Sequence, residues 1–231
     1  MKPSRSNQSC RAFTLVEVAV VVAVVTVLVV IILPKLAGSK SGRRATCVNN
    51  LKEIGMSYRL WAGDNNERFP MEISVTNGGT MELVATGNVV ATFQTMSNQL
   101  STPKILACQQ DKEHFAARNF GAGLTSKNIS YFIGLDAKNN QQPQMIMSGD
   151  DNLTFGNVPM KSGLLLLSPK ANVVWTSSRH TFDHPPIGTL KRHQIYGNLC
   201  FGDGSVQMIN NSSLNNYFQQ TGLATNRLAI P

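Results

Sequence analysis

Apolar residues are concentrated in one run near the amino terminus. Val18 to Leu33 holds only Val, Ala, Leu and Ile apart from Thr26. Counted from Phe13 the run has 21 residues, which as a helix spans about 32 Å, the thickness of a bilayer core. A helix in the core of a soluble domain would show a polar face, and this run shows none. The pattern predicts a transmembrane helix at 13–34 or a signal peptide.

The pattern changes after Pro34 to helical periodicity. Proline can kink a helix without ending it, so we expect a bend at Pro34 and an amphipathic continuation of the helix over 35–63. The apolar positions fall three and four residues apart, as on one helix face. They are Cys47, Leu51, Ile54, Tyr58 and Trp61. The Gly63-Asp64-Asn65-Asn66 stretch ends the pattern.

Residues 64–231 carry short apolar segments separated by polar stretches, which predicts an α+β globular head. Asn88 is expected to cap a short helix, and 213–220 to form another. Gly202-Asp203-Gly204 is a strong hairpin-turn signal. The long polar stretches at 64–80 and 109–128 are expected to be loops. The expected strands are 105–108, 129–133, 144–148, 164–167, 172–176, 198–201 and 206–209.

The whole pattern indicates a long amino-terminal helix packed on a small antiparallel-sheet head. With 231 residues, the chain is long enough for one globular domain and an appendage. The net charge of +8 includes cations on both sides of the apolar run, where they suit a membrane surface. These are Lys2, Arg5 and Arg11 before the run, and Lys35, Lys40, Arg43 and Arg44 after it. Nucleic-acid binding is therefore not expected.

Glu17 is the feature that a signal peptide does not explain. The apolar run is slightly long for one, and the residues after Pro34 make a poor cleavage site. An acidic residue within a membrane helix costs roughly 2.5–3.5 kcal/mol at mid-helix and less near an end. If the chain were cut between Ala12 and Phe13, the new amine would lie about one helical turn from Glu17. The amine of a neighbouring subunit could then pair with this carboxylate.

Ala12-Phe13-Thr14-Leu15-Val16-Glu17 resembles the processing motif of type IV prepilins and type II secretion pseudopilins. Ala12 stands where the family usually has Gly. The resemblance implies that residues 1–12 are a leader, that prepilin peptidase cuts between Ala12 and Phe13 and methylates Phe13, and that Glu17 orders assembly. It also implies a helix bend at Pro34. It places the leader in the cytoplasm, the helix in the inner membrane and the head, 64–231, in the periplasm.

The carboxy-terminal part resembles a pseudopilin-like group in which a His is followed nine residues later by Asp-Gly. His193 and Asp203-Gly204 have that spacing. The function of the motif in that group is poorly defined. The motif therefore narrows the family that the chain resembles and implies no activity.

The four cysteines are Cys10, Cys47, Cys108 and Cys200. Spacing does not determine the pairing, and we favour a disulfide between Cys47 and Cys108. A zinc site made by cysteines is disfavoured because no two of them are close in sequence.

Other candidate chemistry has simpler interpretations. His180, Asp183 and His184 are followed at once by prolines, which favours a surface loop over a metal site. The Asp-Gly turn explains Asp203 without a catalytic pair with His193. Asp136 and 150–152 could offer oxygen ligands to calcium, but they match no calcium-loop spacing. We expect no cofactor and no enzymatic activity.

The function expected from these features is that of a structural pilin-like subunit in a type II secretion pseudopilus or related fibre. Its expected partners are prepilin peptidase, other pilin-like subunits and the inner-membrane assembly platform. Three alternatives stay open: a type IV pilin for adhesion or DNA uptake, a membrane-anchored exported enzyme acting on surface polymers, and a ligand-binding module.

Overall fold

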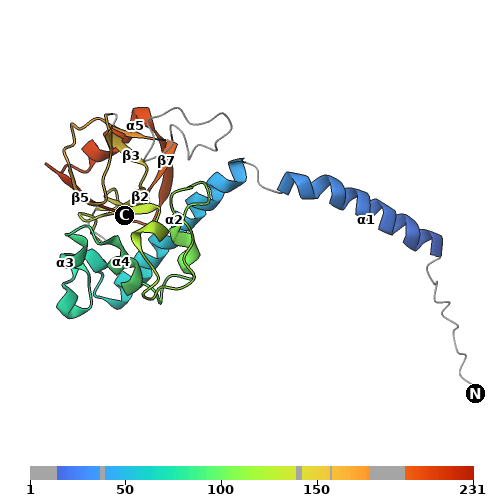
Figure 1. The fold of residues 1–231 in the computed structure, drawn as a ribbon, viewed down its shortest axis with the longest axis horizontal. Helices are drawn as coiled ribbons and strands as arrows, with labels where there is room; N and C mark the ends of the chain where they lie inside the picture. The colour runs from blue at the N-terminus through green and yellow to red at the C-terminus, as the bar shows by residue number, and fades with distance from the viewer. Residues whose placement is uncertain (1–14, 37–39, 139–141, 157, 177–195) are drawn as a thin grey trace, which may run out of the picture. The chain divides into compact units, whose positions relative to one another are not determined.

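The computed structural model describes residues 15–36, 40–138, 142–156, 158–176 and 196–231 (Figure 1). The chain divides into two compact units, Met1–Gly42 and Arg43–Pro231. The described part of the first unit contains helix α1 (Leu15–Leu36) and the start of α2 (Lys40–Asp64). The second unit contains the rest of α2 and the elements that follow it.

Short helices and strands make up the second unit. The remaining α-helices described are α3 (Met81–Val84), α4 (Val89–Thr95) and α5 (Asn211–Gln220), and the 3₁₀ helices are η1 (Pro70–Glu72), η2 (Val75–Asn77), η3 (Pro103–Leu106) and η4 (Ser126–Asn128). The strands described are β1 (Tyr131–Gly134), β2 (Ile146–Asp150), β3 (Leu153–Phe155), β4 (Val158–Pro159), β5 (Gly163–Leu167), β6 (Val173–Trp175), β7 (Tyr196–Phe201), β8 (Val206–Asn210) and β9 (Asn226–Ile230).

Among the described residues, the larger sheet has six strands in the order β5-β9-β1-β2-β7-β8, and a smaller sheet has the order β4-β3-β6. The strand pairs are antiparallel. The described chain is thus α+β with an antiparallel sheet and a helix at its amino-terminal end, an arrangement compatible with a pilin-like fold.

Helix α2 covers one face of the larger sheet. The five side chains expected on one helix face, Cys47, Leu51, Ile54, Tyr58 and Trp61, are all buried. They belong to one hydrophobic core with residues of α4 and with Tyr131 and Ile133 of β1. The periodicity in the sequence therefore identified the helix face that packs on the head.

The opposite face of the sheet has its own core. Phe132, which alternates with Tyr131 and Ile133 along β1, packs with Leu214 and Phe218 of α5. Leu153 and Trp175 of the smaller sheet join the same core. Within this unit, α3 and α4 therefore lie on the α2 side of the sheet, and α5 and β3 lie on the other side (Figure 1).

Several local predictions of secondary structure differ from the structure. Residues 105–108 do not form a strand, because Thr102 caps η3 and Pro103 occupies its first turn. The polar stretches 64–80 and 109–128 are not only loop, since the first contains η1 and η2 and the second contains η4. The short helix expected after Asn88 is α4, and Asn88 does cap it by accepting a hydrogen bond from the Ala91 amide.

Candidate functional site

The expected processing site and the expected anchor lie at the start of the chain. Ala12 and Phe13 lie outside the described residues. Glu17 lies in the first turn of α1 and is exposed, a position where a negative charge is favourable to the helix dipole. The apolar side chains described in α1 are also exposed, from Leu15 at 86% to Val29 at 45%. This helix therefore presents apolar surface that its own unit does not cover.

Pro34 lies within α1, which runs on to Leu36. Helix α2 begins at Lys40, and residues 37–39 lie outside the described residues. The bend expected at Pro34 stays a prediction.

In the part of the chain described by the structure, no helix combines the length and the hydropathy needed to cross a membrane.

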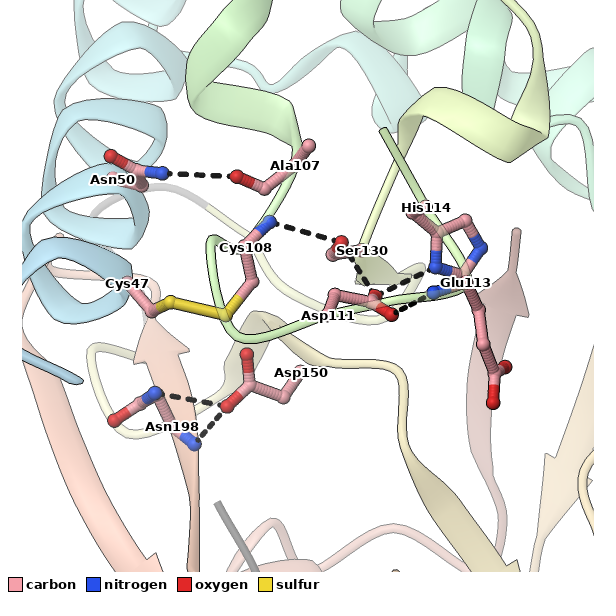
Figure 2. The surroundings of a disulfide bond; sticks show 10 residues. All are labelled: Cys47, Asn50, Ala107, Cys108, Asp111, Glu113, His114, Ser130, Asp150 and Asn198. Atoms are coloured by element: carbon pink, nitrogen blue, oxygen red, sulfur yellow. Dashed lines mark hydrogen bonds and ion pairs between the residues drawn. A yellow bond between two sulfur atoms is a disulfide. The ribbon is translucent and has the colours of Figure 1, made fainter. Parts of the chain in front are cut away.

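A disulfide fastens α2 to the loop that follows η3. Cys47 and Cys108 are bonded, with their Cα atoms 5.2 Å apart (Figure 2). This is the pairing favoured from the sequence. Asn50, one turn later on α2, donates a hydrogen bond to the Ala107 carbonyl. The disulfide thus links the loop covalently to α2, the helix whose apolar face packs in the core of the head.

Beyond the disulfide, the loop holds a carboxylate and an imidazole in contact. Asp111 accepts hydrogen bonds from the Ser130 hydroxyl at 2.7 Å and from the Glu113 amide at 2.9 Å (Figure 2). Its Oδ2 lies 2.7 Å from His114 Nδ1. His114 Nε2 in turn lies 3.8 Å from Oδ2 of Asp151, which follows β2. The exposed side-chain fractions are 3% for Asp111, 9% for His114 and 0% for Asp151.

The Asp111-His114-Asp151 cluster was not predicted from the sequence. Its one local signal was the spacing of three residues between Asp111 and His114 in a stretch expected to be loop. Asp151 lies far from both in sequence and meets them only because Ser130 and β2 bring it there. The Asp151 amide donates to the Ser130 carbonyl, so β1 and β2 position both halves of the cluster.

The oxygen groups that the sequence offers as calcium ligands have different partners in the structure. Asp150 Oδ2 accepts hydrogen bonds from the amide and the side chain of Asn198 (Figure 2). Asp136 instead forms an ion pair with Arg227. Asp151 belongs to the cluster described above.

The Asp-Gly part of the carboxy-terminal motif forms the turn between β7 and β8. Asp203 accepts a hydrogen bond from the Ser205 amide, and Gly204 has φ +82°. The turn lies against α2: a Cβ on Gly55 would come within 2.7 Å of Cys200 Sγ and 3.3 Å of the Gly204 carbonyl. Gly204 therefore supplies the backbone conformation of the turn, and Gly55 allows the close approach of the helix to it. His193, with His180, Asp183 and His184, lies outside the described residues.

Cys200 is buried beneath this turn and is a free thiol. Burial, with a smaller contribution from the negative charge of Asp203, raises the pKa of Cys200 well above its ordinary value. Burial also raises the pKa of Tyr58. Both groups stay protonated at neutral pH, so neither suits a nucleophile or a metal ligand.

Residues 7–33 match the family model described as the prokaryotic N-terminal methylation motif. No curated protein and no solved structure matches the chain significantly. The motif supports a type IV pilin-like subunit that prepilin peptidase processes and that assembles with other pilin subunits, anchored at a membrane.

Proposed function

We propose that the chain is a pseudopilin: a subunit that prepilin peptidase cuts before Phe13 and that assembles into a type II secretion pseudopilus. The observation that carries the proposal is the methylation motif at residues 7–33, with Glu17 five positions into the mature chain. The activity is mechanical. Subunits leave the bilayer and pack helix against helix, and the head stays on the outside of the fibre.

The apolar helix has physical properties that suit both environments in this scheme. In α1, apolar side chains point in all directions, so lipid can solvate them before assembly and neighbouring helices can cover them afterwards. The carboxylate of Glu17 is the exception. We place it against the methylated amine of Phe13 of a neighbouring subunit, where the ion pair would fix the register between helices.

The head is proposed to lie in the periplasm, with the leader in the cytoplasm and α1 in the inner membrane. The disulfide between Cys47 and Cys108 supports this placement, because disulfides persist mainly in oxidising compartments. No catalytic role is proposed for the head.

Deletion of the gene is expected to block secretion of specific proteins. Exported substrates should accumulate in the periplasm and disappear from the medium, because the pseudopilus that expels them cannot form. Quantitative mass spectrometry of both fractions would measure this. The wild-type gene should restore secretion, and a gene lacking the codons for residues 13–36 should not. If the deletion left the protein content of the periplasm and the medium unchanged but abolished adhesion or DNA uptake, the chain would instead be a type IV pilin.

A further inference from the structure

We propose that His114 and Asp151 bind a divalent transition-metal ion of the zinc type, with Asp111 as the residue that positions His114. The inference rests on the Asp111-His114-Asp151 cluster alone and does not depend on the proposed secretion role. Each residue can offer one ligand atom, and these atoms lie within 4.8 Å of one another.

The two nitrogens of His114 have different surroundings. The 2.7 Å contact between Nδ1 and Asp111 is a hydrogen bond in which the imidazole donates, since an ionised carboxylate only accepts. Nε2 is then the ring nitrogen left to bind a metal, and it lies 3.8 Å from Asp151 Oδ2. The side chain of Asp151 is fully buried and that of His114 is 9% exposed, so a metal ion held between them would be largely shielded from solvent.

The 3.8 Å separation fits a metal better than a proton. It is too long for an N–H···O hydrogen bond, which needs about 2.7–3.2 Å between heavy atoms. Zinc binds histidine nitrogen and carboxylate oxygen at roughly 2.0–2.2 Å, so two ligands of a regular tetrahedron lie about 3.4 Å apart. A shift of about 0.4 Å would bring His114 and Asp151 to that spacing.

Asp111 has the contacts of an orienting residue and not of a ligand. Its Oδ1 accepts from the Glu113 amide, and its Oδ2 accepts from Ser130. A carboxylate that holds Nδ1–H of a histidine, leaving Nε2 for the metal, is the usual arrangement around zinc-bound histidines. The imidazole ligand favours a transition ion over calcium or magnesium. Water would complete the coordination.

The test uses the full chain in detergent, stripped of metal with a chelator and titrated with ZnCl₂ by calorimetry. We expect about one zinc per chain. His114→Ala and Asp151→Asn should abolish this binding, and Asp111→Asn should weaken it about 10–100-fold. Asp136→Asn is the matched control, because Asp136 is paired with Arg227 outside the cluster, and it should bind as the wild type does.

Thermal unfolding gives an independent readout that also reports whether each variant folds. At about 100 times the dissociation constant, zinc should raise the melting temperature of the wild type by about 5–10 °C and leave a folded His114→Ala chain unchanged. If a variant does not fold, Co²⁺ bound to the wild type should show the absorption bands of a nitrogen and oxygen site without thiolate bands. No zinc binding by the wild type, or equal binding by His114→Ala, would overturn the proposal.

Discussion

Replacing Glu17 by valine is expected to remove the chain from the assembled fibre while membrane insertion and cleavage continue. Insertion should not suffer, because the change removes the one ionised side chain from the apolar run. Assembly should fail because the methylated amine of the neighbouring subunit loses its counter-charge in the helical core. Breaking a buried ion pair in this way costs roughly 3–5 kcal/mol, enough to lower incorporation by more than about 100-fold.

Thr26→Val is the matched control for this prediction. It also replaces a polar residue of α1 by valine, but the Thr26 hydroxyl already donates to the Val22 carbonyl of its own helix. We therefore expect wild-type incorporation. Immunoblots of sheared fibres and of membranes would measure both variants. Wild-type amounts of Glu17→Val in the fibre would remove the role assigned to this carboxylate.

Removing the disulfide is expected to lower the free energy of unfolding of the head by about 4 kcal/mol. The bond closes a loop with a sequence separation of 61, and the chain-entropy model gives this magnitude for a loop of that length. For a chain of this size the melting temperature should fall by about 8–16 °C. The variant to make is Cys47→Ala/Cys108→Ala.

Tryptophan fluorescence is a suitable readout. The two tryptophans of the chain, Trp61 and Trp175, are both buried in the second unit. The control is a reducing agent, which should lower the melting temperature of the wild type by the same amount and leave the double variant unchanged. A double variant that melts within a degree or two of the wild type would contradict a stabilising role for the bond.

The fold was most predictable where one strong pattern determined it. Cys47, Leu51, Ile54, Tyr58 and Trp61 repeat at helical spacing, and all five are buried. The turn at Gly202-Asp203-Gly204 was predictable because positive φ strongly favours glycine. Both signals are local, so the sequence carries them without knowledge of the rest of the chain.

Short apolar segments were harder to assign. The run at 105–108 is as apolar as a strand, but Thr102 and Pro103 start a 3₁₀ helix instead. Strand β9 (Asn226–Ile230) was not predicted. It forms a strand because it pairs between β5 and β1 in the sheet. A local helix-start signal decided the first segment, and tertiary pairing decided the second.

The Asp111-His114-Asp151 cluster could not have been derived from the sequence. Two of its members lie in a stretch without regular periodicity, and the third follows a strand. Their approach depends on the disulfide at Cys108, on Ser130 and on the pairing of β1 with β2. The processing motif is the opposite case, since it is a short linear stretch that can be identified without the fold of the head, and the family model matches it at residues 7–33.

Mass spectrometry of the mature amino terminus tests the central claim most directly, in cells with and without prepilin peptidase. The account predicts N-methylphenylalanine at position 13 when the enzyme is present and an uncut leader when it is absent. A chain that keeps residues 1–12 in cells with the peptidase, or one cut after Gly38, would contradict it.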